Sequence, residues 1–254
     1  MYHDLVGPDG VRGGFEGAGA AVYAVTMEEF ERQMDGIERR LGAVPQRAGA
    51  ATLEGPGSAW MLTFDDGGAS AALAGAALAR RGWPAHFFIV TEMVGRPGFL
   101  GWDQIRELAA QGHVIGSHSR THPARIAECP VERLRDEWEG SLAALGAELG
   151  APVRMASVPG GYYSADVGTA AAAAGIETLF TSEPTRLPGR IDGCALVGRY
   201  AVRGSTPTPR VLAAAAGSRG AWLEQRAGWE ARRFAKRLAG SRYERIRAAL
   251  LRRR

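Results

Sequence analysis

From about residue 59, short apolar runs alternate with longer helical ones along the chain. The apolar runs are five to seven residues long, which is the length of a buried strand. Strands that alternate with helices build a parallel sheet covered by helices, so the pattern predicts an α/β fold. Two similar runs precede this region. The predicted strands are Tyr2–Val6, Ala21–Val25, Trp60–Phe64, Ala85–Thr91, His113–Ser117, Val153–Val158 and Thr178–Ser182.

Helix signals separate these strands. Thr26 with Glu29 three residues later fits a capping box that opens a helix to about Leu41. Pro130 and Gly150 bracket a long helix over Val131–Leu149. Further helices are predicted over the alanine-rich run to Arg81, over Ile105–Ala110 and around Ala170, and residues 7–19 are predicted to be a glycine-rich loop. The best fit to this order is a barrel of seven or eight β/α units.

Length and composition agree with one large domain. The chain has 254 residues, of which 46% are hydrophobic, and its two cysteines, Cys129 and Cys194, are too few for a disulfide framework. No apolar run reaches the roughly 20 residues of a membrane-spanning helix. Residues 1–8 lack the basic start and apolar run of a secretory signal, so we expect a cytoplasmic protein unless the natural start lies upstream.

Charge divides the chain into a barrel over 1–216 and a basic tail over 217–254. The tail holds twelve Arg or Lys against three Glu, a net charge of +9, whereas the first 216 residues carry −5. We predict an amphipathic helical tail that packs its apolar side on the barrel. Contact with an anionic membrane surface is the alternative, and nucleic-acid contact is the least favoured. The apolar positions of the tail are Trp222, Trp229, Phe234, Leu238, Ile246 and Leu250.

Polar motifs stand where the predicted strands end. Asp65, Asp66 and Gly67 follow one strand, and His118 and His122 follow another. Asp-Asp-Gly by itself also fits an ordinary turn, and the histidine pair by itself a solvated loop. We expect the two histidines to share one side of a helical turn and to meet Asp66 at the carboxyl edge of the sheet. Such a two-histidine, one-carboxylate set leaves positions open for water, which suits metal-assisted hydrolysis.

Two further features lie at the same edge. The segment 157–163 reads Ser-Val-Pro-Gly-Gly-Tyr-Tyr, and a turn there lets backbone N–H groups approach a ligand as an oxyanion hole, the alternative being a plain tight turn. Glu183 follows another strand. It is interpreted as a contact for substrate hydroxyls, as the partner of an arginine, or as a solvated loop acid.

The ordered motifs Thr-Phe-Asp-Asp-Gly at 63–67, His-Ser-Arg-Thr-His at 118–122 and Ser-Val-Pro-Gly-Gly-Tyr at 157–162 resemble those of the polysaccharide deacetylases of the NodB-homology type, the fourth carbohydrate esterase family. The resemblance covers about residues 1 to 200. It implies a distorted (β/α)7 barrel and removal of acetyl groups from N- or O-acetylated sugars. It also implies a divalent metal, most often zinc, although cobalt, manganese, iron or nickel fit the same ligands.

The resemblance assigns roles residue by residue. Asp65 corresponds to the catalytic base, and the backbone N–H of Tyr162 is expected to hold the oxyanion. The substrate is expected to be an N-acetylated polysaccharide or its lipid- or nucleotide-linked precursor. The expected metal ligands are Asp66, His118 and His122, and the expected substrate contacts are Pro159, Gly161 and Glu183.

The sequence departs from the family in the arginine that begins the third motif and orients the base. Ser157 stands at that position, and Arg120, Arg154 and Arg199 are the candidates to replace the arginine.

The family's late histidine, its usual general acid, is also missing, because no histidine follows His122. Tyr2-His3 resembles the Tyr-His of the poly-N-acetylglucosamine deacetylase branch, where an N-terminal strand supplies the acid. We therefore predict His3 as general acid, the alternative being a structural hydrogen bond. His86 and His113 are interpreted as core or surface groups.

Three functions stay open on the sequence. The first is a metal-dependent carbohydrate deacetylase. The second is a sugar-binding pseudoenzyme that keeps the metal and has lost turnover together with its motif arginine. The third is a hydrolase of an O-acetyl ester or a non-sugar amide, since the same chemistry serves all these bonds. A cytoplasmic protein would favour a lipid- or nucleotide-linked sugar, whereas an upstream signal would favour exported polysaccharide.

Overall fold

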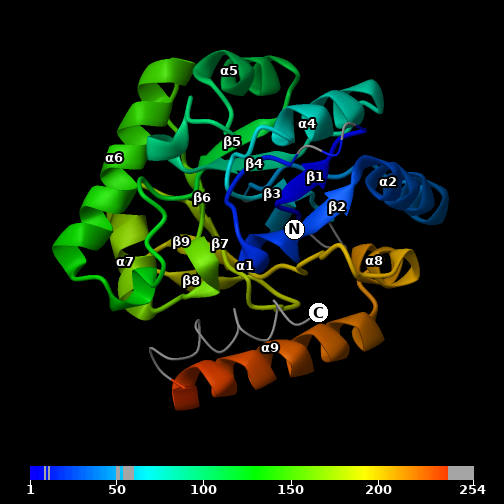
Figure 1. The fold of residues 1–254 in the computed structure, drawn as a ribbon. Helices are drawn as coiled ribbons and strands as arrows, with labels where there is room; N and C mark the ends of the chain where they lie inside the picture. Colours follow the sequence, from blue (N-terminus) through cyan, green and yellow to red (C-terminus); the bar gives the residue numbers. More distant parts are fainter. Residues whose placement is uncertain (9, 11, 50–51, 54–59, 240–254) are drawn as a thin grey trace.

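A curled, mostly parallel sheet forms the centre of the molecule (Figure 1). The computed structural model describes residues 1–254 except 9, 11, 50–51, 54–59 and 240–254, and except the side chains of 232 and 235–239. The seven strands run in the order β3-β4-β5-β6-β7-β9-β8, and only β8 is antiparallel to its neighbour. They are β3 (Thr63–Phe64), β4 (His86–Ile89), β5 (Val114–Ser117), β6 (Met155–Ser157), β7 (Thr178–Phe180), β8 (Gly189–Ile191) and β9 (Cys194–Val197).

The N-terminal segment fills the gap between the two ends of the parallel run. The N–H of Tyr2 donates to the carbonyl of Thr63 at 2.8 Å, and the N–H of Asp65 donates to the carbonyl of Tyr2 at 3.0 Å. On the other side, the carbonyl of Met1 accepts from the N–H of Val202 at 2.9 Å. Beyond this junction, β1 (Asp4–Val6) pairs in parallel with β2 (Ala24–Thr26). The sheet therefore curls into the distorted (β/α)7 barrel that the sequence predicted.

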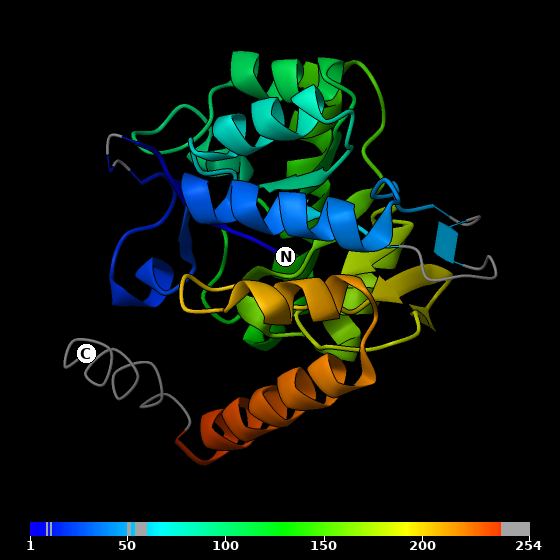
Figure 2. The same cartoon turned by 90° about the vertical axis from the view of Figure 1, so that its right-hand side faces the viewer.

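Helices cover the outside of the curled sheet (Figures 1 and 2). Figure 2 shows two of them, α2 and α8, lying side by side across the N-terminal segment. The helices are α1 (Ala18–Ala21), α2 (Met27–Leu41), α4 (Ala71–Arg80), α5 (Trp102–Ala110), α6 (Val131–Leu149), α7 (Ala165–Ala173), α8 (Thr208–Ala215) and α9 (Arg219–Ala239).

Strand β4 illustrates how the core is divided between the two faces of the sheet. All four of its residues are buried, as expected for a parallel strand that is covered on both sides. Phe87 packs into the cluster beneath α2, α4 and α5. Phe88 packs with Phe180 and Ala48 in a second cluster. Two successive side chains of one short strand thus point to opposite faces of the sheet and belong to two different cores.

Several predicted elements are confirmed, and others need correction. The helix Val131–Leu149 is confirmed, and so is the cap at Thr26, whose hydroxyl accepts from the N–H of Glu29 at 3.2 Å. The strands are shorter than predicted: only Thr63–Phe64 remains of the run from Trp60, and β2 begins at Ala24 because Ala18–Ala21 is helical. The glycine-rich loop therefore ends at residue 17.

The basic tail begins as the long helix α9, which lies along one edge of the molecule. The indole N–H of Trp222 donates to the carbonyl of Pro184 at 2.8 Å, and the amide of Gln225 donates to the carbonyl of Ala201 at 3.0 Å. The outer side exposes Leu223 and Phe234. Of the other apolar tail positions, the side chain of Leu238 and all of Ile246 and Leu250 lie outside the described residues. No described helix has the length and apolarity needed to cross a membrane. A domain boundary at 216 stays a prediction.

Both histidines that were predicted to lie outside the site are buried structural groups. The Nδ1–H of His86 donates to the carbonyl of Leu62 at 3.0 Å, and its Nε2 accepts from the N–H of Ala48 at 2.9 Å. His113 accepts from the N–H of Ala85 and contacts the carbonyl of Gly75. Because a carbonyl can only accept, these bonds fix each ring as one neutral tautomer.

We predict that His86 makes folding sensitive to acid. Burial lowers the pKa of His86 to about 4 in the folded protein, against about 6.5 in an unfolded chain. Between these values the unfolded state binds the extra proton, so stability falls as the pH falls from 6.5 to 4, by about 3 kcal/mol in all. Urea unfolding at several pH values should show this loss in the wild type and a shallower pH dependence in His86→Gln. Equal slopes for the two proteins would contradict the prediction.

Candidate active site

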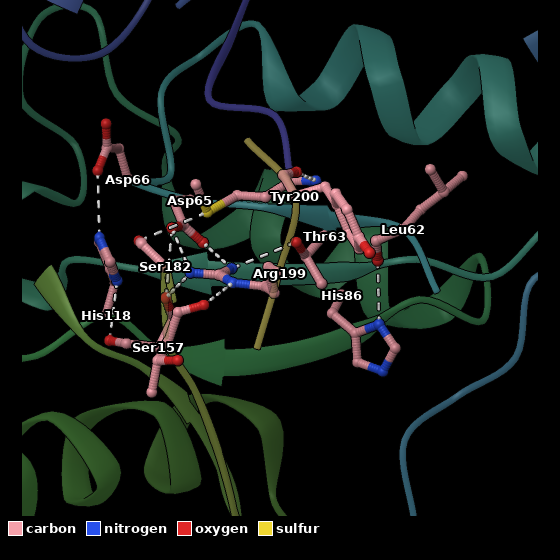
Figure 3. A network of polar contacts seen from close by, with 12 residues as sticks. Leu62, Thr63, Asp65, Asp66, His86, His118, Ser157, Ser182, Arg199 and Tyr200 are labelled. Carbon is pink, nitrogen blue, oxygen red and sulfur yellow. Dashed lines mark hydrogen bonds and ion pairs between the residues drawn. The ribbon is translucent and has the colours of Figure 1, made fainter. Parts of the chain in front are cut away.

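Four parallel strands deliver the polar motifs to one edge of the sheet. Asp65 and Asp66 follow β3, His118 follows β5, Ser157 ends β6, and Arg199 lies two residues beyond β9. Register brings these ends together, since Ile89 lies opposite Ser117 and Ser157 lies opposite Phe180. Figure 3 shows the resulting network of carboxylates, histidines and one arginine.

Asp66, His118 and His122 lie close enough to hold one metal ion. Their donor atoms all lie within 4.8 Å of one another. Oδ1 of Asp66 is 3.3 Å from Nε2 of His118 and 3.7 Å from Nε2 of His122. Ligands about 2.0–2.1 Å from a tetrahedral ion stand roughly 3.4 Å apart, so the spacing fits zinc and similar ions. The donor set of two imidazoles and one carboxylate also fits.

A hydrogen bond orients the imidazole of His118. Its Nδ1–H donates to the carbonyl of Ser157 at 2.9 Å, which leaves Nε2 facing Asp66 (Figure 3). A backbone partner on the remote nitrogen is the usual way in which a metal-binding histidine is fixed. Burial alone would lower the pKa of His118, but the carboxylates of Asp65 and Asp66 raise it above its usual value.

Left-handed backbone, rather than a helical turn, brings the two histidines together. The helical turn expected over 118–122 is wrong, because Ser119 and His122 have φ of 64° and 56°. Asp66, the third residue of the set, also has a positive φ, of 76°. Such angles are uncommon for residues other than glycine and cost about 1–3 kcal/mol each. Local bonds hold them, because the N–H of His122 donates to Oγ of Ser119 at 3.0 Å.

The loop that carries the histidines is also anchored from outside. Buried Glu137 on α6 accepts from the N–H of Thr121 at 2.7 Å and from its hydroxyl at 2.5 Å. Ser117 donates to the hydroxyl of Ser141 at 2.7 Å, likewise on α6. The long helix thus fixes the position of the loop relative to the sheet.

Arg199 pairs with Asp65 in place of the motif arginine, for which this sequence has Ser157. Its guanidinium binds both carboxylate oxygens of Asp65, at 2.7 and 2.9 Å, and donates to Oγ of Ser157 at 2.6 Å. It also lies over the rings of Phe88 and Phe180, at 5.6 and 5.7 Å from their centroids. Asp65 is 3% exposed and Arg199 is 5% exposed. Burial alone would raise the pKa of Asp65, but the Arg199 charge and its hydrogen bonds hold that pKa well below the usual range.

The other two candidate arginines pair elsewhere. Arg154 contacts Glu177 at 2.9 Å, and Arg120 contacts Glu92 and Asp136, each at 3.0 Å. All these pairs are solvent-exposed, so neither arginine serves Asp65. The sequence left three candidate arginines as partners of Asp65. The parallel pairing of β9 with β7 is what places Arg199, and not the other two, next to Asp65.

His3 lies within the electrostatic influence of Asp65 and Asp66. Its ring contacts the ring of Tyr23 at a tilt of 34°, with 4.3 Å between centroids. Its Nδ1 is buried and has no hydrogen-bond partner among the described residues. Burial lowers the pKa of His3, while the charges of Asp66 and Asp65 act in the opposite direction. The ring is therefore within the electrostatic field of both aspartates, as a general acid there would need to be.

The predicted oxyanion and substrate residues have other contacts. Pro159–Gly161 forms a single 3-10 turn, and the N–H of Tyr162 donates weakly to the carbonyl of Pro159 at 3.4 Å. Gly160 and Gly161 have φ of 61° and 67°, which permits this turn. Glu183 pairs with Arg226 of α9 at 2.7 Å. Of the three interpretations of Glu183, the arginine partner is the one in this structure.

The fold and the candidate donor set together fit one class, the (β/α)7 deacetylases, with Asp66, His118 and His122 as the residues that could hold a metal. The chain belongs to the polysaccharide deacetylase family, whose model matches residues 53–179, half of the sequence. It is accordingly a deacetylase-type hydrolase.

Solved structures confirm the fold. IcaB from Ammonifex degensii is 24% identical with a TM-score of 0.63, over 84% of this chain and 96% of that one. A Streptococcus pyogenes deacetylase, PplD, solved in complex with acetate, is 17% identical with a TM-score of 0.65, over 84% of this chain and 94% of that one. A polysaccharide deacetylase from Bacillus cereus is 21% identical with a TM-score of 0.69, over 85% of this chain and 67% of that one.

We predict that Arg199→Ala destabilises the protein by about 3–5 kcal/mol, because it leaves the buried Asp65 carboxylate unpaired. Arg199→Lys should be less harmful to stability but should lose the two-pronged contact. Arg154→Ala is the matched control and should cost less than about 1 kcal/mol, since its ion pair is exposed. Denaturant unfolding measures all three. Equal stability of Arg199→Ala and Arg154→Ala would contradict the role given to Arg199.

Proposed function

We propose that the protein is a metal-dependent deacetylase that hydrolyses the acetamide of N-acetylated sugars in a polysaccharide or in its lipid- or nucleotide-linked precursor. One observation carries the proposal: the Asp66, His118 and His122 donors lie next to a carboxylate, Asp65, that is kept ionised by Arg199. A hydrolase of this kind needs a bound cation and a base side by side. The proposal extends the family's deacetylase chemistry to a cofactor and a substrate.

Asp66, His118 and His122 would hold the cation, most often zinc in such a donor set, with cobalt, manganese, iron or nickel as the alternatives. When bound, a divalent ion supplies Lewis acidity and lowers the pKa of a water molecule in its coordination sphere. The Nδ1–H bond from His118 to Ser157 leaves its Nε2 available for this purpose. The remaining steps belong to side chains of the chain itself.

Asp65 would act as the general base. Water adds to the acetyl carbon and gives its proton to a carboxylate oxygen of Asp65, which Arg199 and Ser157 hold in place. His3, in its protonated form, would then donate a proton to the sugar nitrogen as the C–N bond breaks, so that acetic acid and the free amine leave. The proton on Asp65 would then pass to solvent, and His3 would take up a new one. The Nδ1 of His3 has no hydrogen-bond partner among the described residues, so it is not committed to a structural bond.

The backbone N–H of Tyr162 would stabilise the oxyanion, and its bond to Pro159 is long enough to be exchanged for a stronger acceptor. Pro159 and Gly161 remain the proposed wall of the substrate site. Glu183 pairs with Arg226 through Oε1, so a sugar hydroxyl would donate to its other carboxylate oxygen.

The substrate class rests on the resemblance of the motifs. An O-acetyl ester or a non-sugar amide would need the same base and cation, so those bonds are the alternatives to test. The buried Asp65–Arg199 pair argues against a pseudoenzyme that lost turnover together with its motif arginine. Cytoplasmic location stays a prediction. So does contact of the tail with an anionic membrane, although exposed Leu223 and Phe234 among arginines suit such a surface.

The test is metal stoichiometry by elemental analysis after zinc reconstitution and dialysis, followed by acetate release from N-acetylated oligosaccharides. We predict about one metal per chain in the wild type and none in the Asp66→Ala, His118→Ala double variant. Asp65→Asn should retain the metal and lose acetate release by at least about 100-fold. A wild type that retains no metal, or an Asp65→Asn variant as active as wild type, would overturn the proposal.

We predict that His3→Ala lowers kcat by about 100-fold or more without changing metal content, because only proton donation to the departing nitrogen is lost. An O-acetylated substrate with a good leaving group needs less help from an acid, so its kcat should fall much less. A kcat within about threefold of wild type on the amide would show that His3 has a structural role instead.

A further inference from the structure

The glycine-rich segment before α1 lies against the edge of the sheet that carries the site. The N–H of Gly14 donates to the carbonyl of Gly98 at 2.6 Å, and the N–H of Gly13 donates to Oδ1 of Asp4 at 3.1 Å. A Cβ atom on Gly13 would lie 2.7 Å from the backbone nitrogen of Ala69, and one on Gly68 would lie 2.7 Å from that of Gly14. Only glycine permits backbones to approach this closely. The position of the segment is therefore fixed.

Phe15 follows these glycines, and its ring contacts a candidate metal ligand. Its centroid is 4.7 Å from that of His122, at an interplanar angle of 41°. Its other side meets Phe99 edge to face, with 5.1 Å between centroids at 76°. Phe99 is buried, so it provides a firm support. Phe15 is thus held between the core and the imidazole of His122.

The two histidines of the site differ in how their rings are held. His118 has its hydrogen bond to the carbonyl of Ser157. The ring of His122 has a hydrogen bond to its own backbone, but among the described residues no hydrogen bond from another residue holds it. Its ring contacts are Phe15 and, at 5.1 Å, His118. A metal-binding histidine without a fixed orientation loses rotamer entropy on binding, which weakens the site. Aromatic packing is the restraint that another residue supplies to this ring.

We propose that Phe15 is a positioning residue of the metal site, which holds the imidazole of His122 toward Asp66 by packing against that ring. The inference rests on the metal site of the proposed function. It gives the glycine-rich segment a task that the catalytic roles above do not include. It also makes residues far apart in the sequence, Phe15 and His122, one functional unit.

The test is a cobalt titration of metal-free protein in competition with a chelator, followed by visible absorption. Phe15→Leu keeps an apolar side chain against Phe99 but removes the flat ring, and Phe15→Tyr restores it. We expect about tenfold weaker cobalt affinity in Phe15→Leu, more in Phe15→Ala, and an affinity near wild type in Phe15→Tyr. Phe234→Leu, the same change at an exposed position on α9, should bind cobalt as the wild type does.

Each result that contradicts the inference has a different meaning. Cobalt affinity of Phe15→Leu within twofold of wild type would overturn the inference, and a raised KM with unchanged affinity would assign Phe15 to the substrate instead. A wild type that binds no metal would overturn the proposed function and this inference with it. A weakened Phe15→Leu beside a wild type with one tight site would support both.

Discussion

The buried ion pair between Asp65 and Arg199 is the interaction on which the rest of the site depends. Two charges removed from water are tolerated only when each is fully paired, and here the guanidinium meets both carboxylate oxygens and the hydroxyl of Ser157. The three residues follow or end three different strands, β3, β6 and β9. A shift of any of these strands would leave a charge buried without a partner. The ion pair therefore couples the curl of the sheet to the position of the proposed base.

The N-terminal segment closes the barrel and supplies the proposed acid in the same stretch of chain. Backbone bonds from Tyr2 to Thr63 and Asp65 fix its path, and His3 is the next residue. Asp4 then accepts from the hydroxyl of Ser70 at 2.5 Å and from the N–H of Gly13. Because these contacts are made by successive residues, the ring of His3 has little freedom to leave the aspartates. The same stretch of chain therefore closes the fold and places the proposed acid.

The sequence predicted those features that local patterns determine. Pro130 and Gly150 stand directly before and after helix Val131–Leu149. The motifs at Asp65 and His118 lie directly after apolar runs. Arg199 could not be chosen over Arg120 and Arg154, because its approach to Asp65 depends on the register of strands far apart in the sequence. The helical turn expected over 118–122 failed because spacing alone does not reveal left-handed backbone at Ser119 and His122.

The strained backbone at these motifs has a physical explanation in the contacts around it. Asp66 and His122 adopt positive φ, which the chain would avoid unless other bonds outweighed the cost. Next to Asp66, the carbonyl of Gly67 accepts from the N–H of Leu100 at 3.0 Å. The N–H of His122 donates to the hydroxyl of Ser119. Both supports come from loops rather than from strands. The donor atoms of Asp66 and His122 consequently owe their spacing to loop contacts, whereas His118 owes its orientation to the backbone of β6. A site built in this way requires loops that are packed as firmly as the sheet. The close glycine contacts of segment 13–15 hold one loop, and the bond from Thr121 to Glu137 of α6 holds the loop with the histidines.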